Sequence, residues 1–181
     1  EAQLAKSRRL ADRDGYANTR FEKGYIEQIP VADESATAVI SNGVINLCSD
    51  KAAVFREIAR VLEPGGRLAI SDIVTEHQLT EAIVCDVNLW ASCIGGAMQQ
   101  DDYRAAIEAA GLSIEAVQQN PEYEFISDSA QGATDTFGVK SISILAVLGR
   151  YESGIVVINR IVFGPFNFFF KIIDRVRKIG K

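Results

Sequence analysis

Three cysteines, Cys48, Cys85 and Cys93, carry the side chains of this sequence that are best suited to soft chemistry. A thiolate is a soft ligand for soft electrophiles and metalloids, and the dipole at a helix N-terminus lowers the pKa of a nearby thiol. Cys48 precedes a predicted helix, and Cys93 follows Trp90. A buried, structural role is the alternative for Cys48 and Cys93, and we expect Cys85 to pack within a helix.

Polar residues and a glycine follow two predicted strands. Asn42 and Gly43 come after a strand at 37–41, and Asp72 lies near the end of a strand at 67–74. Doubly wound sheets bind ligands at the carboxyl ends of their strands, so these residues are candidates for a site. Turn formation and loop capping are the alternatives. The single histidine, His77, is assigned no role, and no metal ion is expected.

Strands and helices alternate along the chain, which predicts an α/β fold with a doubly wound, mostly parallel sheet. We predict strands at 19–22, 37–41, 67–74, 112–118 and 140–148. We predict helices at 1–14, 49–62, 80–91 and 101–110, with Ser49 or Asp50, Thr80 and Asp101 as the N-caps of the last three. The helix at 49–62 has an apolar stripe formed by Val54, Phe55, Ile58, Val61 and Leu62.

Two connections complete the predicted architecture. Pro64, Gly65 and Gly66 end the second helix in a sharp turn. Residues 119–139 show no helical pattern, so we predict that the last two strands form an antiparallel hairpin at the edge of the sheet.

Composition separates the chain into a body and a tail. The 181 residues have a net charge of −5, which argues against a nucleic-acid partner. Residues 151–181 carry six basic and two acidic side chains, so residues 1–150 carry a charge of −9. We therefore expect a domain at 1–150 and a basic, apolar extension at 151–181. Three cysteines without a secretory signal predict a reducing, cytoplasmic location.

The extension has the pattern of an amphipathic helix, with Phe166, Phe169, Phe170, Ile173 and Val176 at helical spacing. Such a helix can dock on its own domain, on a second copy of the chain, or on an anionic membrane surface. We favour docking, which allows a homo-oligomer, because large exposed apolar patches are disfavoured in soluble proteins.

Four segments resemble those of a known family: 21–33 (FEKGYIEQIPVAD), 39–47 (VISNGVINL) with Asp50 and Lys51, 60–68 (RVLEPGGRL), and 89–97 (LWASCIGGA). The first and third are similar to segments of S-adenosylmethionine (SAM)-dependent class I methyltransferases, and the second and fourth to segments of arsenite methyltransferases. The resemblance implies a Rossmann-like fold, SAM as cofactor and a small-molecule substrate. It also implies six cofactor-contacting residues, at the adenine pocket and the lip of the site: Ile26, Glu27, Ser41, Asn42, Gly43 and Val44.

The sequence departs from the family pattern in two places. The glycine-rich loop and the acidic ribose-binding residue that precede these segments in the family are absent, so we expect a fold incomplete at the N-terminus and a chain cut from a longer protein. In addition, Gly43 stands where the arsenite family has one of its arsenic-binding cysteines. Cys93 matches the other, and Cys48 is the candidate replacement.

The sequence therefore predicts a SAM-dependent methyltransferase whose acceptor is a trivalent arsenical or a similar soft group. Two alternatives stay open. One is a non-catalytic methyltransferase-like domain that acts as an interaction module, and the other is a methyltransferase for a small organic acceptor that uses the space at Gly43.

Overall fold

The computed structural model describes residues 1–125 and 128–149, so the extension at 151–181 lies outside the described residues. The strands are β1 (Ala36–Asn42), β2 (Leu62–Thr75), β3 (Met98–Gln99), β4 (Leu112–Gln119) and β5 (Lys140–Leu148). The helices are α1 (Ala2–Arg13), the 3-10 helix η1 (Ile45–Leu47), α2 (Lys51–Val61), α3 (Glu81–Val84), α4 (Val87–Ala91), α5 (Gln100–Ala109) and α6 (Asp128–Phe137). None of these helices is long and apolar enough to cross a membrane.

The strands form one sheet in the order β1-β2-β5-β4, with the short β3 beside β2. The pairing of β1 with β2 is parallel, whereas β5 is antiparallel to both β2 and β4. Of the described strands only β5 therefore runs in the opposite direction. This arrangement confirms the predicted α/β fold with a mostly parallel sheet and an antiparallel final pair. β1 forms one edge of the described sheet.

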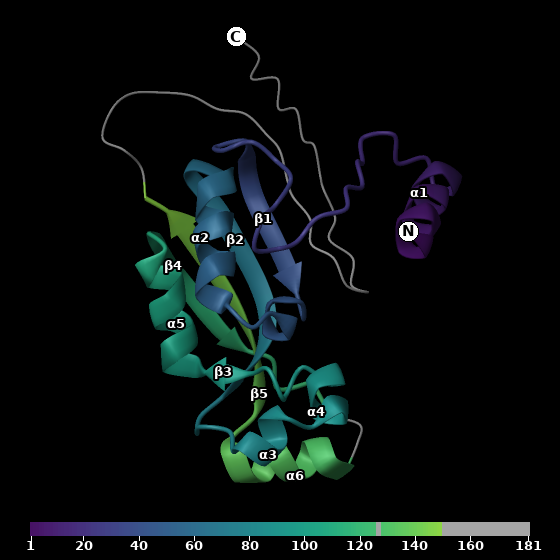
Figure 1. Cartoon of the computed structure of the whole chain (residues 1–181). Helices are drawn as coiled ribbons and strands as arrows, with labels where there is room; N and C mark the ends of the chain where they lie inside the picture. Colours follow the sequence, from purple (N-terminus) through teal and green to yellow (C-terminus); the bar gives the residue numbers. More distant parts are fainter. Residues whose placement is uncertain (126–127, 150–181) are drawn as a thin grey trace.

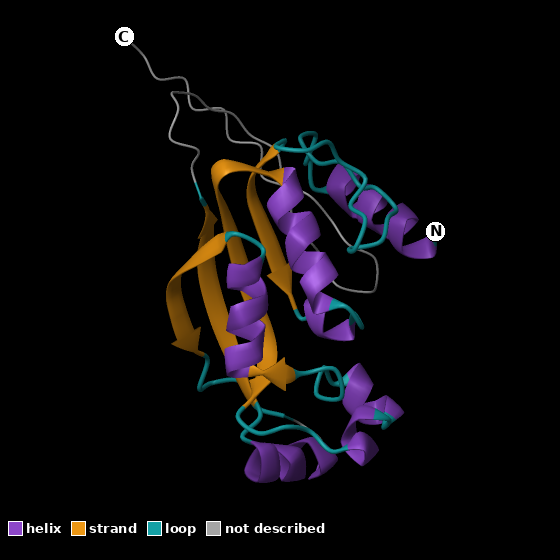
Figure 2. Ribbon diagram, turned by 60° about the vertical axis from the view of Figure 1, so that its left-hand side comes forward, coloured by secondary structure: helices purple, strands orange, loops and turns teal. Residues whose placement is uncertain are grey.

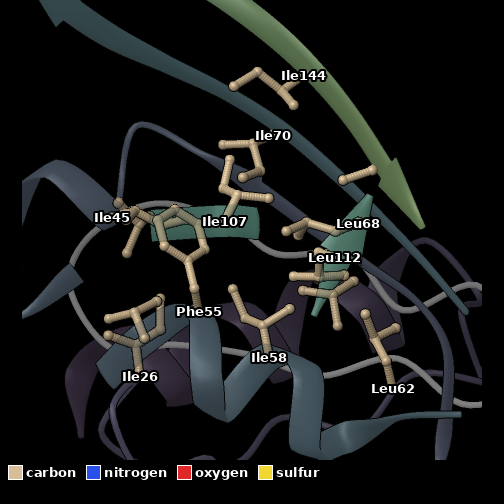
Figure 3. Packing of buried hydrophobic residues seen from close by; sticks show 14 of the residues in the cluster. Ile26, Ile45, Phe55, Ile58, Leu62, Leu68, Ile70, Ile107, Leu112 and Ile144 are labelled. Carbon is tan, nitrogen blue, oxygen red and sulfur yellow. The ribbon is translucent and has the colours of Figure 1, made fainter. Parts of the chain in front are cut away.

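Helices α2 and α5 cover one face of the sheet (Figure 1, Figure 2). The predicted stripe of α2 is confirmed, since Phe55 and Ile58 point from the helix toward Leu68, Ile70 and Ile107 (Figure 3). Burying each such side chain stabilises the fold by about 1.5–3 kcal/mol. This packing fixes the start of α2 against the carboxyl end of β2.

A second apolar cluster lies at that carboxyl end, where α3, α4 and α6 gather (Figure 1). Its buried members come from β2, from α4 and the loop after it, and from α6 and the residue before β5: Ile73, Leu89, Ile94, Ala130, Ala133 and Val139. The cluster holds the segment that contains Cys93 against the end of the sheet.

The predicted strand at 19–22 is wrong. The segment forms no ladder, and the nearby pairing is a single isolated bridge between Tyr25 and Gln28. A strand exists only when a neighbouring strand takes up its backbone hydrogen bonds, and no described strand lies beside this segment.

The single helix predicted at 80–91 is also wrong, because the segment forms two short helices, α3 and α4. The Asp86 carboxylate accepts hydrogen bonds from the backbone N–H groups of Asn88 and Leu89, at 2.8 and 2.9 Å. These bonds make Asp86 the N-cap of a new helix and interrupt the first one. Thr80 occupies the N-cap of α3 without a side-chain bond.

Two further expectations need correction. The N-cap of α5 is Gln99, and Asp101 lies in the first helical turn instead, where a carboxylate complements the helix dipole. Residues 128–137, expected to be non-helical, form α6, because Ala130 and Ala133 pack in the second cluster. Asp50 is confirmed as the cap of α2, since its carboxylate accepts a bond of 2.8 Å from the N–H of Ala53.

Candidate functional site

The carboxyl ends of β1 and β2 lie side by side at the same end of the sheet. Asn42 pairs with Ser71, and the N–H of Gly43 donates to the carbonyl oxygen of Ser71 at 2.9 Å. Gly43 has a φ of +65°, and a Cβ at this position would meet no atom within 4 Å. The chain thus turns sharply at Gly43 and leaves open space beside it.

Cys93 approaches this turn from the loop after α4. Its Sγ donates a hydrogen bond to the carbonyl oxygen of Gly43 at 3.4 Å. Cys93 has a φ of +62°, a left-handed conformation that glycine normally occupies after a helix. A strained residue held by its surroundings is a marker of functional sites. The thiol is therefore presented at the turn at a cost to the backbone.

Two glycines allow the loop to come this close. A Cβ on Gly96 would lie 1.9 Å from the carbonyl oxygen of Asn46, and one on Gly95 would lie 2.7 Å from the Trp90 ring. The Asn46 side chain completes the contact, because its Nδ2 donates to the carbonyl oxygens of Ile73 at 2.6 Å and Cys93 at 3.4 Å. Sequence reasoning gave Asn46 no role.

Cys48 lies on the other side of the same turn, directly after η1. Its Sγ donates to the carbonyl oxygen of Val44 at 3.8 Å, and its side chain is buried. The two thiols thus bind the carbonyl groups of consecutive residues, Gly43 and Val44. The structure brings Cys48 and Cys93 to one turn although 45 positions separate them in the sequence.

Both thiols are weak acids in this environment. Burial, with a further contribution from the charge of Glu27, raises the pKa of Cys48 to about 12. Burial and the charge of Asp72 raise the pKa of Cys93 to about 11. Both are therefore protonated at neutral pH. Burial therefore outweighs the lowering of the Cys48 pKa that was expected from the nearby helix N-terminus.

The six predicted cofactor residues divide by exposure. Ile26 and Val44 point into the main core, and Ser41 is buried with an unpartnered Oγ. Glu27 and Asn42 are exposed, and Gly43 is half-buried. Glu27 lies close enough to Cys48 for its charge to act on that thiol. The segment around Glu27 therefore borders the turn from Gly43 to Cys48, called the thiol turn below.

A buried carboxylate lies beneath the turn. Asp72 is 3% exposed, and burial raises its pKa to about 6. The hydroxyl of Tyr103 donates to its Oδ2 at 3.2 Å. Tyr103 lies in α5, and no pattern in the sequence indicated its pairing with Asp72.

The remaining residues with chemical potential lie elsewhere or play a lesser part. Cys85, which was expected to pack within a helix, is instead exposed at the end of α3. Tyr123, which sequence reasoning missed, lies near Cys93. Burial raises the pKa of Tyr123, and the charge of a thiolate at Cys93 raises it further. Within residues 1–125 and 128–149, no group of three or more His, Cys, Asp or Glu side chains is arranged to hold a metal ion.

The sequence of this chain is similar to those of known methyltransferases. The sequence family described as a methyltransferase domain matches residues 1–111. The arsenite methyltransferase of Halobacterium salinarum is 39% identical over 126 residues, which make up 69% of this chain and 32% of that protein. The human arsenite methyltransferase is 39% identical over 99 residues, 53% of this chain and 26% of that protein. The matched part of the chain thus spans at most a third of these relatives.

Solved methyltransferase structures are also similar to this chain. An arsenic(III) S-adenosylmethionine methyltransferase from Chlamydomonas reinhardtii superimposes with a TM-score of 0.55 at 27% identity, over 73% of this chain and 44% of that one. A geranyl diphosphate C-methyltransferase from Streptomyces coelicolor superimposes with a TM-score of 0.67 at 16% identity, over 81% of this chain and 61% of that one. The second likeness concerns the fold alone. The resemblance predicted from the four segments is confirmed.

Proposed function

This chain belongs to the methyltransferase domain family, and on that premise we propose that it transfers a methyl group from SAM to a small soft acceptor, a trivalent arsenical. One observation carries the proposal: the Cys93 thiol lies at the carbonyl group of Gly43, with the Cys48 thiol at the next carbonyl group. Two thiols at one turn suit a thiophilic centre.

The residues at the end of β1 fit one side of a SAM site. Ser41 has an unpartnered hydroxyl, Gly43 leaves open space, and Glu27 supplies an exposed carboxylate. A cofactor with hydroxyl and amino groups can use such partners. SAM, when bound, supplies an electrophilic methyl group on its sulfonium sulfur. The protein then has to hold the acceptor in line with that group and exclude water.

The two thiols bind the acceptor by ligand exchange. Each sulfur forms a bond to arsenic, each S–H bond breaks, and each proton leaves with an arsenic-bound hydroxide as water. The arsenic keeps its lone pair, which is the nucleophile for methyl transfer. No change of oxidation state occurs in this binding step.

The raised pKa values of both thiols agree with this exchange. A thiol with a pKa near 11 or 12 is a poor nucleophile at neutral pH, which protects it from alkylation. Exchange with an arsenic hydroxide needs no free thiolate at the start, because the departing hydroxide takes the proton. No general base is therefore required.

Titration of the chain with phenylarsine oxide tests the acceptor. We expect one equivalent to bind the wild type and Cys85→Ser, the matched control with its exposed thiol. Cys48→Ser and Cys93→Ser should each bind about 100-fold more weakly, because the second bond of a chelate forms within one molecule. Equal binding by all four proteins would overturn the acceptor assignment. Titration with S-adenosylhomocysteine tests the cofactor separately, and its failure to bind the folded chain would favour an interaction module.

A small organic acceptor is the second candidate, favoured by the open space at Gly43. This candidate would be established over the first by two results together. The wild type would capture no arsenical, and Cys93→Ser would transfer methyl groups to an organic acceptor as well as the wild type does.

A further inference from the structure

Two charged side chains lie buried under the thiol turn without a part in the methyl transfer described above. Lys51 is 6% exposed and Asp72 is 3% exposed. Removing charges from water costs several kcal/mol for each ion, and apolar side chains at buried charged positions are often as stable or more stable. Stability alone therefore does not account for this pair.

Asp72 lies beneath the first part of the thiol turn. Its carboxylate accepts a hydrogen bond from the backbone N–H of Ile73 at 3.0 Å, and the backbone N–H of Asn46, in η1, lies close enough to favour the charged form of the carboxylate. Its Oδ2 also accepts a hydrogen bond from the hydroxyl of Tyr103. The fully buried ring of Tyr103 packs edge-on against Phe55, with the ring centroids 5.2 Å apart. The carboxylate thus ties η1 and α5 to the end of β2.

Lys51 holds the end of the turn. It is the first residue of α2, and its Nζ donates to the carbonyl oxygen of Cys48 at 3.1 Å. The charge of Asp72 acts favourably on this ammonium group and opposes the effect of burial on its pKa. Lys51 therefore binds the backbone directly at Cys48, and the Asp72 carboxylate lies near the backbone N–H of Asn46, on the other side of Leu47.

The same turn carries the Cys93 loop. The Asn46 side chain is fully buried and donates to the carbonyl oxygens of Ile73 and Cys93. A shift of η1 would move Asn46, and with it the contact to Cys93. Both thiols therefore depend on the position of a three-residue 3-10 helix.

We propose that Lys51 and Asp72 are positioning residues, which fix the turn between Gly43 and Cys48 on the end of β2 and so set the spacing of the two thiols. The inference rests on the proposed function, since it gives the pair a role in holding the acceptor. The residues act through the backbone and do not touch the substrate.

The test compares wild type, Lys51→Met, Asp72→Asn and the double variant, with Lys140→Met as the control. Lys140 pairs with Glu76 at 2.7 Å away from the thiol turn, so its loss should leave both thiols in place. We expect the double variant to melt at or above the wild-type temperature, yet to bind phenylarsine oxide at least about tenfold more weakly. Affinity within twofold of wild type would overturn the proposal. So would weaker binding that appears only with a lower melting temperature.

A second measurement keeps the inference separate from the proposed acceptor. The N–H groups of Leu47 and Cys48 donate to Val44 and Ile45 at 3.0 Å each, so their hydrogen exchange reports on the turn. We expect exchange at these two amides to accelerate at least about tenfold in the double variant, while amides of β5 are unchanged. If wild type captures no arsenical, the acceptor assignment fails and the exchange result still decides the inference. Unchanged exchange would overturn it.

Discussion

The Sγ of Cys93 lies 3.4 Å from the carbonyl oxygen of Gly43, a residue fifty positions earlier in the chain. The contact places a strained cysteine at a turn that has room for a side chain. It defines the centre of the candidate site.

Gly43→Cys should create a third thiol at the turn and tighten capture of phenylarsine oxide at least about tenfold. The space is open, but the φ of +65° costs a non-glycine residue about 1–2 kcal/mol. Gly43→Ala is the control, since it carries the same backbone cost without sulfur. Calorimetric titration of both variants checks the expectation, which fails if their affinities are equal.

Cys93→Gly should be more stable than Cys93→Ser by about 1 kcal/mol in the free energy of unfolding, because glycine adopts the φ of +62° without strain. Both variants should lose arsenical capture. Urea denaturation of the two proteins measures the difference. A serine variant at least as stable as the glycine variant would show that the left-handed conformation is not strained.

Gly96→Ala should lower the free energy of unfolding by more than about 2 kcal/mol, because the added Cβ would lie 1.9 Å from a backbone oxygen of Asn46. Gly132→Ala is the matched control in α6, where a Cβ meets nothing within 4 Å. Alanine there should be neutral or stabilising by up to about 1 kcal/mol, as in other helices. Similar effects at both positions would contradict the close approach at Gly96.

Asp72 should make stability depend on pH. Burial raises its pKa to about 6 in the folded state, above the ordinary value of 3.8. Its contribution to stability is thus full below about pH 4, falls as the pH rises to about 6, and is lost above that. The free energy of unfolding of Asp72→Asn relative to wild type should rise by about 3 kcal/mol over this range. Urea titrations of both proteins between about pH 3 and pH 7.5 test the rise, and a constant difference would refute it.

The three cysteines should react with iodoacetamide in a fixed order. Cys85 is exposed and should be alkylated first. Cys93 and Cys48, with pKa values near 11 and 12, should react slowly at neutral pH, about tenfold faster for each added pH unit. Peptide mapping by mass spectrometry resolves the three sites. Rapid alkylation of Cys48 at pH 7 would contradict its burial.

Several elements follow from the sequence because local pattern and global fold agree. The stripe of Phe55 and Ile58 predicted α2 and its buried face, and Asp50 was recognised as its cap. The strand predicted at 140–148 is β5 with its observed bounds. The segments around Gly43 and Cys93 indicated the family, because such segments are identified by residue type alone.

Tertiary structure decided the rest, because contacts between distant residues leave little local pattern. The segment at 19–22 has strand-forming residues but no described neighbour to pair with. Ala130 and Ala133 form a helix that the local sequence does not favour, since packing on Ile73 and Val139 outweighs weak propensity. In the same way, the sequence supplied two thiols and a buried carboxylate, but only folding placed Cys48, Cys93 and Asp72 around a single turn.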